Sequence, residues 1–262
     1  MPSSPASWQL PPGVTRGLWD YLHDPQIACG YDEYLAGSTM TAADQAFAER
    51  HFARPGRLVD LGCGTGRLLV PFALRGFWVL GVDLSHGMLR AAGEKAELAG
   101  TPIHLVRANL VELSCLADQS FDHAACLFST LGMIAGDAER RRVLAHVFRL
   151  LRPGGCFVLH VHNRWFNFWS RPGRWWLLKD ICRSLLRRPE SGDCVMPAHL
   201  GIGELTLHLF TRREALRLLR AAGFRIVEVQ PLGLTGDGRL RRRWWLSGLR
   251  SYGYLIAATR ER

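Results

Sequence analysis

An alternation of short apolar runs with helical stretches, from residue 57 to residue 161, limits the possible folds of this chain more than any other feature. The apolar runs lie at residues 57–61, 77–82, 103–106, 121–128 and 156–161. Stretches with helical spacing lie between them, at about 66–76, 85–99 and 137–151. Because the runs are apolar almost without interruption, they are typical of parallel strands covered by helices on both faces. The sequence therefore predicts an α/β protein built on a mostly parallel sheet.

Several element boundaries can also be predicted. A helix is expected over residues 41–53, with Thr41 as its N-cap. The sequence RPGG at residues 152–155 predicts the end of a helix followed by a turn. Beyond residue 162 the alternation is interrupted, and regular structure is expected to resume with a strand at 204–210, a helix at 211–222, a strand at 224–230 and a last strand near 252–259.

The composition excludes several classes of protein. Of the 262 residues, 48% are hydrophobic and 21% are charged, which is too apolar for intrinsic disorder. The longest apolar stretch, residues 175–186, contains Lys179, Asp180 and Arg183, so no membrane-spanning segment is expected. The N-terminus lacks the pattern of a signal peptide, and the seven cysteines form no C-x-x-C pair. We therefore expect a cytoplasmic protein with reduced thiols, without a disulfide framework or a metal site.

The net charge of +10 is unevenly distributed along the chain. Residues 1–160 carry 14 Lys and Arg against 15 Asp and Glu, whereas residues 161–262 carry 19 against 8. A basic second half suggests an acidic partner, which would be a nucleic acid, an anionic membrane surface or an anionic small molecule.

The segment VDLGCGTG at residues 59–66 carries the most chemical information. Its glycines, Gly62, Gly64 and Gly66, let the backbone turn tightly and approach a ligand closely. The helix that follows offers free N–H groups at its start. Asp83 ends the next apolar run, where a carboxylate can accept both hydrogen bonds from a ribose diol. The sequence therefore predicts a site for a nucleoside-containing cofactor at the carboxyl edge of the sheet.

Other nucleotide-binding patterns do not match. The glycine spacing differs from the G-x-G-x-x-G of a pyrophosphate loop, and no Gly-Lys-Ser/Thr phosphate loop is present. A Tyr-x-x-x-Lys pair is excluded because Ala91 and Trp175 stand four residues before Lys95 and Lys179, the only lysines. An acidic residue just before the glycines, Asp60, suits a cationic amino-acid group better than a pyrophosphate.

Five segments resemble, in order, the motifs of the class I S-adenosylmethionine-dependent methyltransferases: VDLGCGTGR, VLGVDLS, RANLVEL, FDHAACLFSTLG and LLRPGGCFVLHVHN. The segment HLFTRREALRLLRAAGFRIVEV resembles the later part of the same fold, so the resemblance extends from residue 57 to about residue 230. It implies a Rossmann-like seven-stranded sheet of strand order 3-2-1-4-5-7-6 with strand 7 antiparallel and helices on both faces. It also implies S-adenosylmethionine as the cofactor.

The resemblance implies roles for individual residues. The residues implied to hold the cofactor are, for its methionine part, Asp60, Gly62, Cys63, Gly64 and Gly66; for its ribose, Asp83; for its adenine, Leu84, Met88, Asn109 and Leu110; and for the route to its methyl group, Phe128 and Ser129. The family commonly has Asp where this chain has Asn109, but an amide oxygen can also accept a hydrogen bond from the adenine amine.

Methyl transfer from a sulfonium mostly needs positioning, and it needs a base only if the nucleophile must lose a proton. The segment at residues 128–131 does not resemble the motif of enzymes that methylate exocyclic amines of bases. His160 and His162 alternate on one face at the end of the fifth strand. They could act as a general base or hydrogen-bond the substrate, or they could be buried structural histidines. A metal site formed by the two is the least favoured interpretation. Tyr31 and Tyr34 resemble aromatic residues that fold over the cofactor in this family, where a ring can contact the sulfonium, although simple packing is the alternative.

The least generic segment is an insert at residues 163–203, in which tryptophans and arginines are interleaved. Within it, one helical face combines Leu178, Ile181, Cys182, Leu185 and Leu186, with basic residues opposite. This insert could be a lid over the acceptor, a stacking surface for nucleic acid, an interfacial helix on anionic lipid, or a helix packed on its own domain. The basic and aromatic combination recurs at residues 239–245.

The sequence thus divides into an N-terminal cap segment, residues 1–40, and a methyltransferase domain, residues 41–262, with residues 163–203 as an insert on the substrate side. The leading hypothesis is methyl transfer to oxygen, nitrogen or carbon of a small-molecule or lipid-like acceptor. Its candidate catalytic residues are His160, His162 and Tyr31. One alternative is methylation of RNA, most readily tRNA, through the basic second half. Another is a non-catalytic cofactor-binding protein that keeps the fold.

Overall fold

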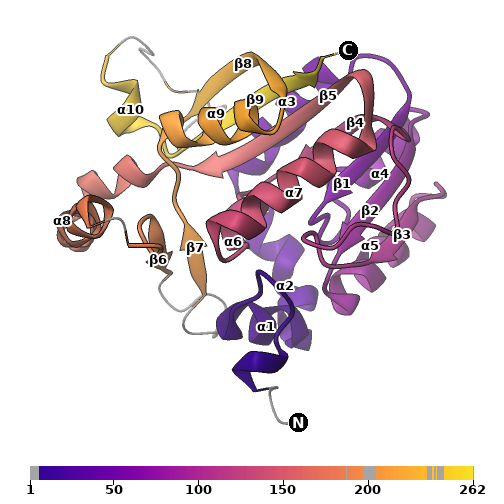
Figure 1. Ribbon diagram of the computed structural model, residues 1–262. Coiled ribbons are helices and arrows are strands. Elements are labelled where there is room, and N and C mark those ends of the chain that lie inside the picture. The colour runs from indigo at the N-terminus through magenta and orange to yellow at the C-terminus, as the bar shows by residue number, and fades with distance from the viewer. Residues whose placement is uncertain are drawn as a thin grey trace.

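A seven-stranded sheet forms the centre of the protein (Figure 1). The computed structural model describes residues 6–186, 188–196, 205–234, 238, 240 and 245–261. The strands of the sheet are β1 (Arg57–Leu61), β2 (Trp78–Asp83), β3 (His104–Arg107), β4 (Phe121–Cys126), β5 (Leu151–His162), β8 (Phe224–Leu232) and β9 (Gly253–Arg260). Their order is β3-β2-β1-β4-β5-β9-β8, and β9 runs antiparallel to both neighbours. This arrangement confirms the predicted Rossmann-like fold.

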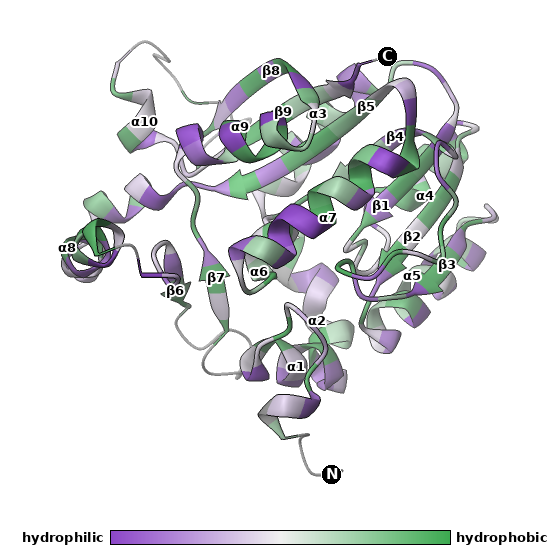
Figure 2. Ribbon diagram, in the orientation of Figure 1, coloured by the Kyte–Doolittle hydropathy of each residue, from purple (hydrophilic) through white to green (hydrophobic). Residues whose placement is uncertain are grey.

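Helices cover both faces of the sheet (Figure 1). They are α1 (Arg16–His23), α2 (Pro25–Leu35), α3 (Thr39–His51), α4 (Leu69–Leu74), α5 (His86–Leu98), α6 (Thr130–Met133), α7 (Asp137–Leu150), α8 (Arg171–Leu185), α9 (Arg212–Ala221) and α10 (Ser247–Arg250). On one face α7 and α9 pack through Val147 and Leu219, and on the other α3 and α4 pack through Phe47 and Phe72. Figure 2 shows the hydrophobic residues along the central strands. Both faces are buried, which explains why these strands read as apolar runs.

The structure corrects two predicted boundaries. Helix α3 begins at Thr39 rather than at residue 41, and Thr41 does not cap it, because its Oγ1 donates to the carbonyl oxygen of Ser38 at 2.7 Å. Residues 152–155 form no separate turn but belong to β5. The pairing of β5 with β4 shifts register there, and Gly154 has a φ of +80°. The RPGG sequence therefore makes a bulge at the start of a strand, directly after α7 ends.

The insert after β5 contains a 3-10 helix (Arg164–Trp169), α8 and the short strand β6 (Asp193–Val195). Strand β6 pairs antiparallel with β7 (Thr206–His208), outside the main sheet. The strand predicted at residues 204–210 is therefore shorter and belongs to this small ladder. The proposed boundaries of the cap segment and of the insert stay predictions.

Helix α8 packs on the domain with a different side from the one its leucine pattern suggests. Leu177 and Asp180 are buried, and Asp180 forms an ion pair with the buried Arg164. The predicted apolar face points outward, with 38–78% exposure at Leu178, Ile181, Leu185 and Leu186. The interpretation that the helix packs on its own domain through this apolar face is therefore wrong. Neither α8 nor another helix of the described chain has the length and apolar character needed to cross a membrane.

The start of the insert is fixed by Asn163, a side chain that is 1% exposed. Its Nδ2 donates to the carbonyl oxygens of Gly248 and Ser251 at 2.7 and 2.8 Å. Its Oδ1 accepts from the backbone N–H of Trp165 at 3.2 Å, and its own N–H donates to the carbonyl oxygen of Tyr252 at 2.8 Å. One side chain therefore joins the end of β5, the insert and the segment before β9.

We expect Asn163→Ala to lower the free energy of unfolding by about 2–3 kcal/mol, because it leaves buried backbone groups without partners. Asn167→Ala is the matched control, since it removes one hydrogen bond, from a partly exposed Nδ2 to the carbonyl oxygen of Arg164. That variant should cost less than about 1 kcal/mol. Urea denaturation measures both, and equal losses would contradict the anchoring role of Asn163.

Candidate functional site

A cavity opens at the carboxyl ends of β1, β2 and β4, the edge at which open α/β sheets usually bind ligands. It holds about 920 Å³ of space, its open mouth included. Residues of α1 and α2 cover it, and the loops after the three strands form the opposite wall. The lining residues are Val14, Leu18, Tyr21, Leu22, Tyr31, Asp60, Gly62, Cys63, Gly64, Arg67, Leu68, Asp83, Leu84, Met88, Asn109, Leu110, Leu127, Phe128, Thr130, Met133 and Ile134.

The glycine loop after β1 has left-handed backbone at all three glycines and leaves no room for a side chain at Gly62. Gly62 has a φ of +76°, and a Cβ there would lie 2.4 Å from Cγ2 of Thr130. Gly64, with a φ of +52°, lines the cavity directly. Gly66 also has a left-handed backbone, but it faces α5, where a Cβ would lie 3.1 Å from Cβ of Ala92. The first two glycines therefore shape the cavity, and the third allows a close contact between helices.

Two buried carboxylates stand at the cavity wall. Oδ2 of Asp83 accepts from the N–H of Gly64 at 2.9 Å, and Oδ1 accepts from the N–H of Ser85 at 2.8 Å. Burial raises the pKa of Asp83. Asp60 is 3% exposed, and its side chain makes no hydrogen bond within the part of the chain that the structure describes. Burial raises the pKa of Asp60 to about 7 despite the nearby guanidinium of Arg67. A buried carboxylate with free acceptor sites favours a cationic donor as its ligand.

The N-terminal helices are held over the cavity by hydrogen bonds from strand ends. Oγ of Ser85 donates to the carbonyl oxygen of Leu22 at 2.7 Å. Nδ2 of Asn109 donates to the carbonyl oxygen of Pro12 at 2.9 Å, while its Oδ1 accepts from the N–H of Val111 at 3.1 Å. The amide nitrogen of Asn109 is therefore used to hold the N-terminal segment, and its oxygen is the atom that can face a ligand amine.

Helix α2 is joined to the glycine loop by a second set of contacts. Oγ1 of Thr65 donates to Oδ1 of Asp32 at 2.7 Å, and Nζ of Lys95 lies 2.7 Å from Oδ2 of the same carboxylate. Burial opposes the ionisation of Asp32, but these partners outweigh it and lower the pKa of Asp32. This attachment holds Tyr31 over Gly64, where the ring lies 3.6 Å from the position that a Cβ would take.

A charged cluster behind the cavity was not predicted from the sequence. Asp44, on α3, is fully buried, and its Oδ2 accepts from Nη2 of Arg67 at 2.7 Å. Its Oδ1 lies 2.7 Å from Nδ1 of His160. Burial opposes the ionisation of Asp44, but His160 and Arg67 outweigh it and lower the pKa of Asp44. In the sequence, the one feature that could have pointed to Arg67 is its position directly after the glycine motif. No feature of the sequence pointed to Asp44.

Phe128 and Ser129 follow β4 with left-handed backbones, at φ values of 52° and 61°. Phe128 lines the cavity, and its ring centroid is 5.6 Å from the guanidinium carbon of Arg67. Ser129 is fully buried, with its N–H donating to the carbonyl oxygen of His160 and its Oγ accepting from the N–H of His162, each at 3.2 Å. Ser129 therefore connects β4 to β5 from behind the cavity wall.

A second cavity lies at the end of β5, beside the insert. Its lining residues are His162, Asn163, Phe166, Asn167, Trp169, Ser170, Cys194, Met196, Leu207, Leu209 and Tyr252. His162 is 7% exposed, and its Nε2 has no hydrogen-bond partner among the described residues. Burial, with a smaller effect of His160, lowers the pKa of His162 to about 3, so the imidazole is neutral at physiological pH. The ring centroids of Phe128, which lines the first cavity, and His162, which lines the second, are 6.0 Å apart, so the two linings are in contact through these rings.

The first cavity gathers most of the residues predicted to hold a cofactor. Those that line it are Asp60, Gly62, Cys63, Gly64, Asp83, Leu84, Met88, Asn109, Leu110 and Phe128, together with Tyr31. Gly66, Ser129 and His160 do not line it, because local packing turns them into the protein. The side chain of Tyr34 is outside the described part of the structure. Burial raises the pKa of Cys63 well above its ordinary value, so its thiol stays protonated. Among the described residues no cluster of metal-ligating side chains occurs.

A family model and several known proteins resemble this chain. The family model, described as a methyltransferase domain, matches residues 58–155. A methyltransferase from Geobacillus sp. is 33% identical over 142 residues, which are 52% of this chain and 56% of that protein. The chain thus spans about half the length of this curated relative. The ubiquinone biosynthesis O-methyltransferase of Paracidovorax citrulli is 32% identical over 209 residues, which are 78% of this chain and 76% of that protein.

Among solved structures, the chain resembles the 1,6-didemethyltoxoflavin-N1-methyltransferase of Burkholderia thailandensis, crystallised with 1,6-didemethyltoxoflavin and S-adenosylhomocysteine. The TM-score is 0.63 at 20% sequence identity, and the match covers 97% of this chain and 93% of that one. At this identity the likeness shows a common fold.

We expect Asp60→Asn to stabilise the ligand-free protein at pH 8. The folded-state pKa of Asp60, about 7, lies above its ordinary value of 3.8, so ionisation costs the folded state stability as the pH rises from about 4 to 7. Asparagine cannot ionise, so the variant should escape this loss. Relative to wild type, it should gain on the order of 2 kcal/mol between pH 5 and pH 8. Urea denaturation at both pH values measures this gain, and a pH-independent difference would contradict the raised pKa.

Proposed function

The chain belongs to the class I S-adenosylmethionine-dependent methyltransferases, and on this basis we propose that it transfers a methyl group to a small, largely apolar acceptor. One observation carries the proposal: a cavity with two buried carboxylates at a glycine loop is separated from a second cavity, with a mostly apolar and aromatic lining, by the contact of the Phe128 and His162 rings. When bound, S-adenosylmethionine supplies a methyl group on a positively charged sulfur, which an acceptor nucleophile can displace.

The first cavity fits an adenosine joined to an amino acid. Each oxygen of Asp83 accepts one backbone hydrogen bond and, as a carboxylate oxygen, can accept another from a ribose hydroxyl. The buried carboxylate of Asp60, which makes no hydrogen bond to another described residue, suits the ammonium of the amino-acid part. Leu84 and Met88 offer an apolar surface to an adenine ring. Tyr31 lines the same cavity, and its ring can stabilise a sulfonium through a cation–π contact.

We assign the acceptor to the second cavity. Its described lining includes the aromatic rings of Phe166, Trp169 and Tyr252, and it contains no Asp, Glu, Lys or Arg. A charged acceptor would lose its hydration there without a compensating partner, whereas a planar apolar molecule would replace water at aromatic and aliphatic surfaces. The cavity therefore favours a small ring-containing acceptor, methylated at oxygen, nitrogen or carbon.

In this proposal His162 orients the acceptor. Its Nε2 has no hydrogen-bond partner among the described residues, but a base whose conjugate acid has a pKa of about 3 removes protons poorly at neutral pH. A neutral imidazole instead holds a hydroxyl or amine in line with the methyl group, and positioning of this kind is the main requirement of the displacement. His160 lies behind it as a positioning residue. Its ring contacts Asp44, and its backbone carbonyl oxygen accepts a hydrogen bond from the N–H of Ser129.

The alternative enzymatic function is methylation of RNA, most readily tRNA. It rests on the basic second half of the chain, but most of the basic stretch at residues 239–243 lies outside the described residues. The apolar lining of the second cavity favours a small acceptor over a base within a polyanion. Methyl transfer to bulk tRNA, with salt-sensitive binding, would support the RNA alternative. Cofactor binding without turnover on any acceptor would support the non-catalytic alternative.

We expect Asp83→Ala to weaken binding of S-adenosylhomocysteine by about 100-fold, because two hydrogen bonds to a buried carboxylate are lost. Asp122→Ala is the matched control, since Oδ2 of Asp122 also accepts from a backbone N–H, that of Arg57, but at the opposite end of the strands. Its affinity should stay within about twofold of wild type. Isothermal titration calorimetry measures all three proteins. If wild type binds neither S-adenosylhomocysteine nor S-adenosylmethionine, the proposed activity is wrong.

We expect His162→Ala to lower kcat/KM by about 10- to 100-fold without changing the affinity for S-adenosylhomocysteine. The assay follows methyl transfer to a panel of small phenols, hydroquinones and nitrogen heteroaromatics. His162→Gln, which keeps a hydrogen-bonding group, should recover part of the activity. No inflection from His162 is expected between pH 6 and pH 9, because its pKa lies near 3. Equal losses of cofactor affinity and activity would show a structural role instead.

A further inference from the structure

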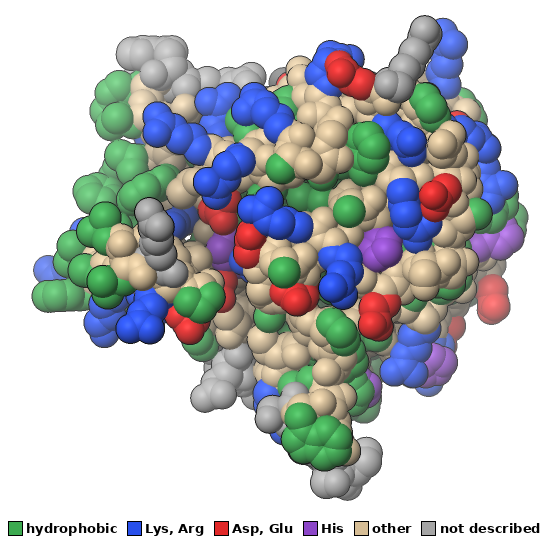
Figure 3. Space-filling model, viewed as in Figure 1, with side chains coloured by type: hydrophobic (Ala, Val, Ile, Leu, Met, Phe, Trp, Pro, Cys, Tyr) green, Lys and Arg blue, Asp and Glu red, His purple; other side chains and the backbone are tan. Residues whose placement is uncertain are grey.

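A cleft between α7, α8 and α9 shares no lining residue with either cavity and is lined by six arginines. They are Arg140, Arg141, Arg164, Arg188, Arg213 and Arg217. Figure 3 shows this face of the molecule, where basic side chains surround a hollow that holds acidic side chains and a histidine. The proposed methyl transfer uses none of these arginines, so the cleft needs an explanation of its own.

Two arginines at the floor of the cleft have donors without a partner among the described residues. Arg140 is 2% exposed, and its one hydrogen bond among the described residues runs from Nη1 to the carbonyl oxygen of Ile134. Arg164 is 8% exposed and pairs with Asp180. In both side chains Nε has no hydrogen-bond partner within the described ranges of the chain. A buried guanidinium with unmet donors costs free energy, and an anion beside it would offset that cost.

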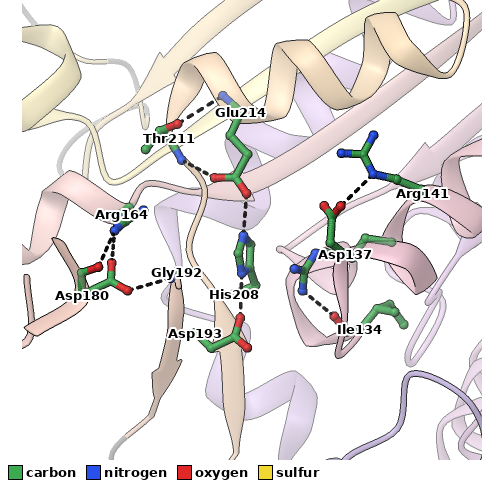
Figure 4. Close-up of polar contacts among 11 residues, drawn as sticks. Ile134, Asp137, Arg141, Arg164, Asp180, Gly192, Asp193, His208, Thr211 and Glu214 are labelled. Carbon is green, nitrogen blue, oxygen red and sulfur yellow. Dashed lines mark hydrogen bonds and ion pairs between the residues drawn. The ribbon is translucent and has the colours of Figure 1, made fainter. Parts of the chain in front are cut away.

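The carboxylates of the cleft are already engaged, as Figure 4 shows. Asp137 accepts from Nε of Arg141 at 2.7 Å. His208 lies between two more, with Nδ1 2.7 Å from Oδ1 of Asp193 and Nε2 2.9 Å from Oε1 of Glu214. Burial works against the charge of His208, but these two hydrogen bonds outweigh it and raise the pKa of His208. With Asp180 and Glu139 included, five carboxylates stand against six guanidiniums and a histidine that favours its charged form.

The excess positive charge is at the rim. Arg213 and Arg217 stand one turn apart on α9, and both are exposed. Like charges at this spacing destabilise a helix. Arg188, also exposed, lines the same cleft from the end of the insert. None of the three takes part in an ion pair within the described chain. A ligand with several acceptor oxygens could meet these three guanidiniums and Arg140 together.

We propose that this cleft is a binding site for an anion of the phosphate class. Guanidinium forks match phosphate oxygens in pairs, and a tetrahedral anion can accept from several directions at once, as arginines from α7, α9 and the insert require. Two sources share this chemistry: a free phosphorylated molecule and the headgroup of an anionic phospholipid. The second source gains from Ile181 and Leu185, which belong to the exposed apolar face of α8 and also line the cleft.

The first experiment titrates the full chain with inorganic pyrophosphate by calorimetry at constant ionic strength. Arg213→Ala/Arg217→Ala removes two charges from the rim of the cleft. Arg212→Ala/Arg220→Ala removes two exposed charges from the same helix but outside the cleft, so the net charge of both variants is equal. We expect the first pair to weaken pyrophosphate binding about tenfold or more and the second to leave it within about twofold.

The second experiment distinguishes the two sources by sedimentation with vesicles of phosphatidylcholine, with and without phosphatidylglycerol. A headgroup site predicts binding only to the anionic vesicles, loss of that binding in the Arg213→Ala/Arg217→Ala variant, and competition by pyrophosphate. A site for a free phosphorylated molecule predicts the pyrophosphate result without vesicle binding. Equal losses in both double variants, or no binding of either probe by wild type, would overturn the proposal. Unchanged affinity for S-adenosylhomocysteine in both variants checks that the fold is intact.

Discussion

The two cavities depend on one buried carboxylate, that of Asp44. It holds Arg67, which follows the glycine loop, and His160, which lies in β5, so it joins three segments that are distant in the chain. Removing one partner from such a buried set leaves an uncompensated charge, at a cost of about 3–5 kcal/mol. The carbonyl oxygen of His160 also accepts a hydrogen bond from the N–H of Ser129. Asp44 and its two partners therefore also fix the backbone next to Phe128. The wall between the cavities is therefore held by charge as well as by apolar packing.

Most of the sheet could be predicted because its signals are local. A strand buried on both faces must be apolar along its length, and the runs at β1, β2 and β4 show this directly. The glycine spacing after β1 reflects a turn that rejects any Cβ at Gly62, and Asp83 stands where its strand ends. Residues whose position follows from a strand end or a tight turn therefore line the cavity as expected.

Contacts between distant segments could not be predicted in the same way. Periodicity shows that the leucines of α8 share a face, but the buried pair of Asp180 with Arg164 decides which side turns inward. Asp44 is one of two acidic residues on α3, the other being Glu49, and nothing in its spacing marks it as buried. Ser129 occupies the expected place in its motif, yet its left-handed backbone directs it into the protein. In each case a long-range partner determines the outcome.

Strand β7 lies between the second cavity and the arginine cleft. Leu207 and Leu209 line the second cavity, whereas His208, between them, lines the arginine cleft, as alternation along an extended chain requires. The segment 207–209, which includes the end of β7, therefore lies between the two spaces. A displacement of this segment toward one space would narrow that space and enlarge the other. By thermodynamic reciprocity, an occupant that displaced it would alter the affinity on the other side by the same factor that it experiences in return. Two chemically unrelated molecules can thus influence each other across a single layer of backbone without touching.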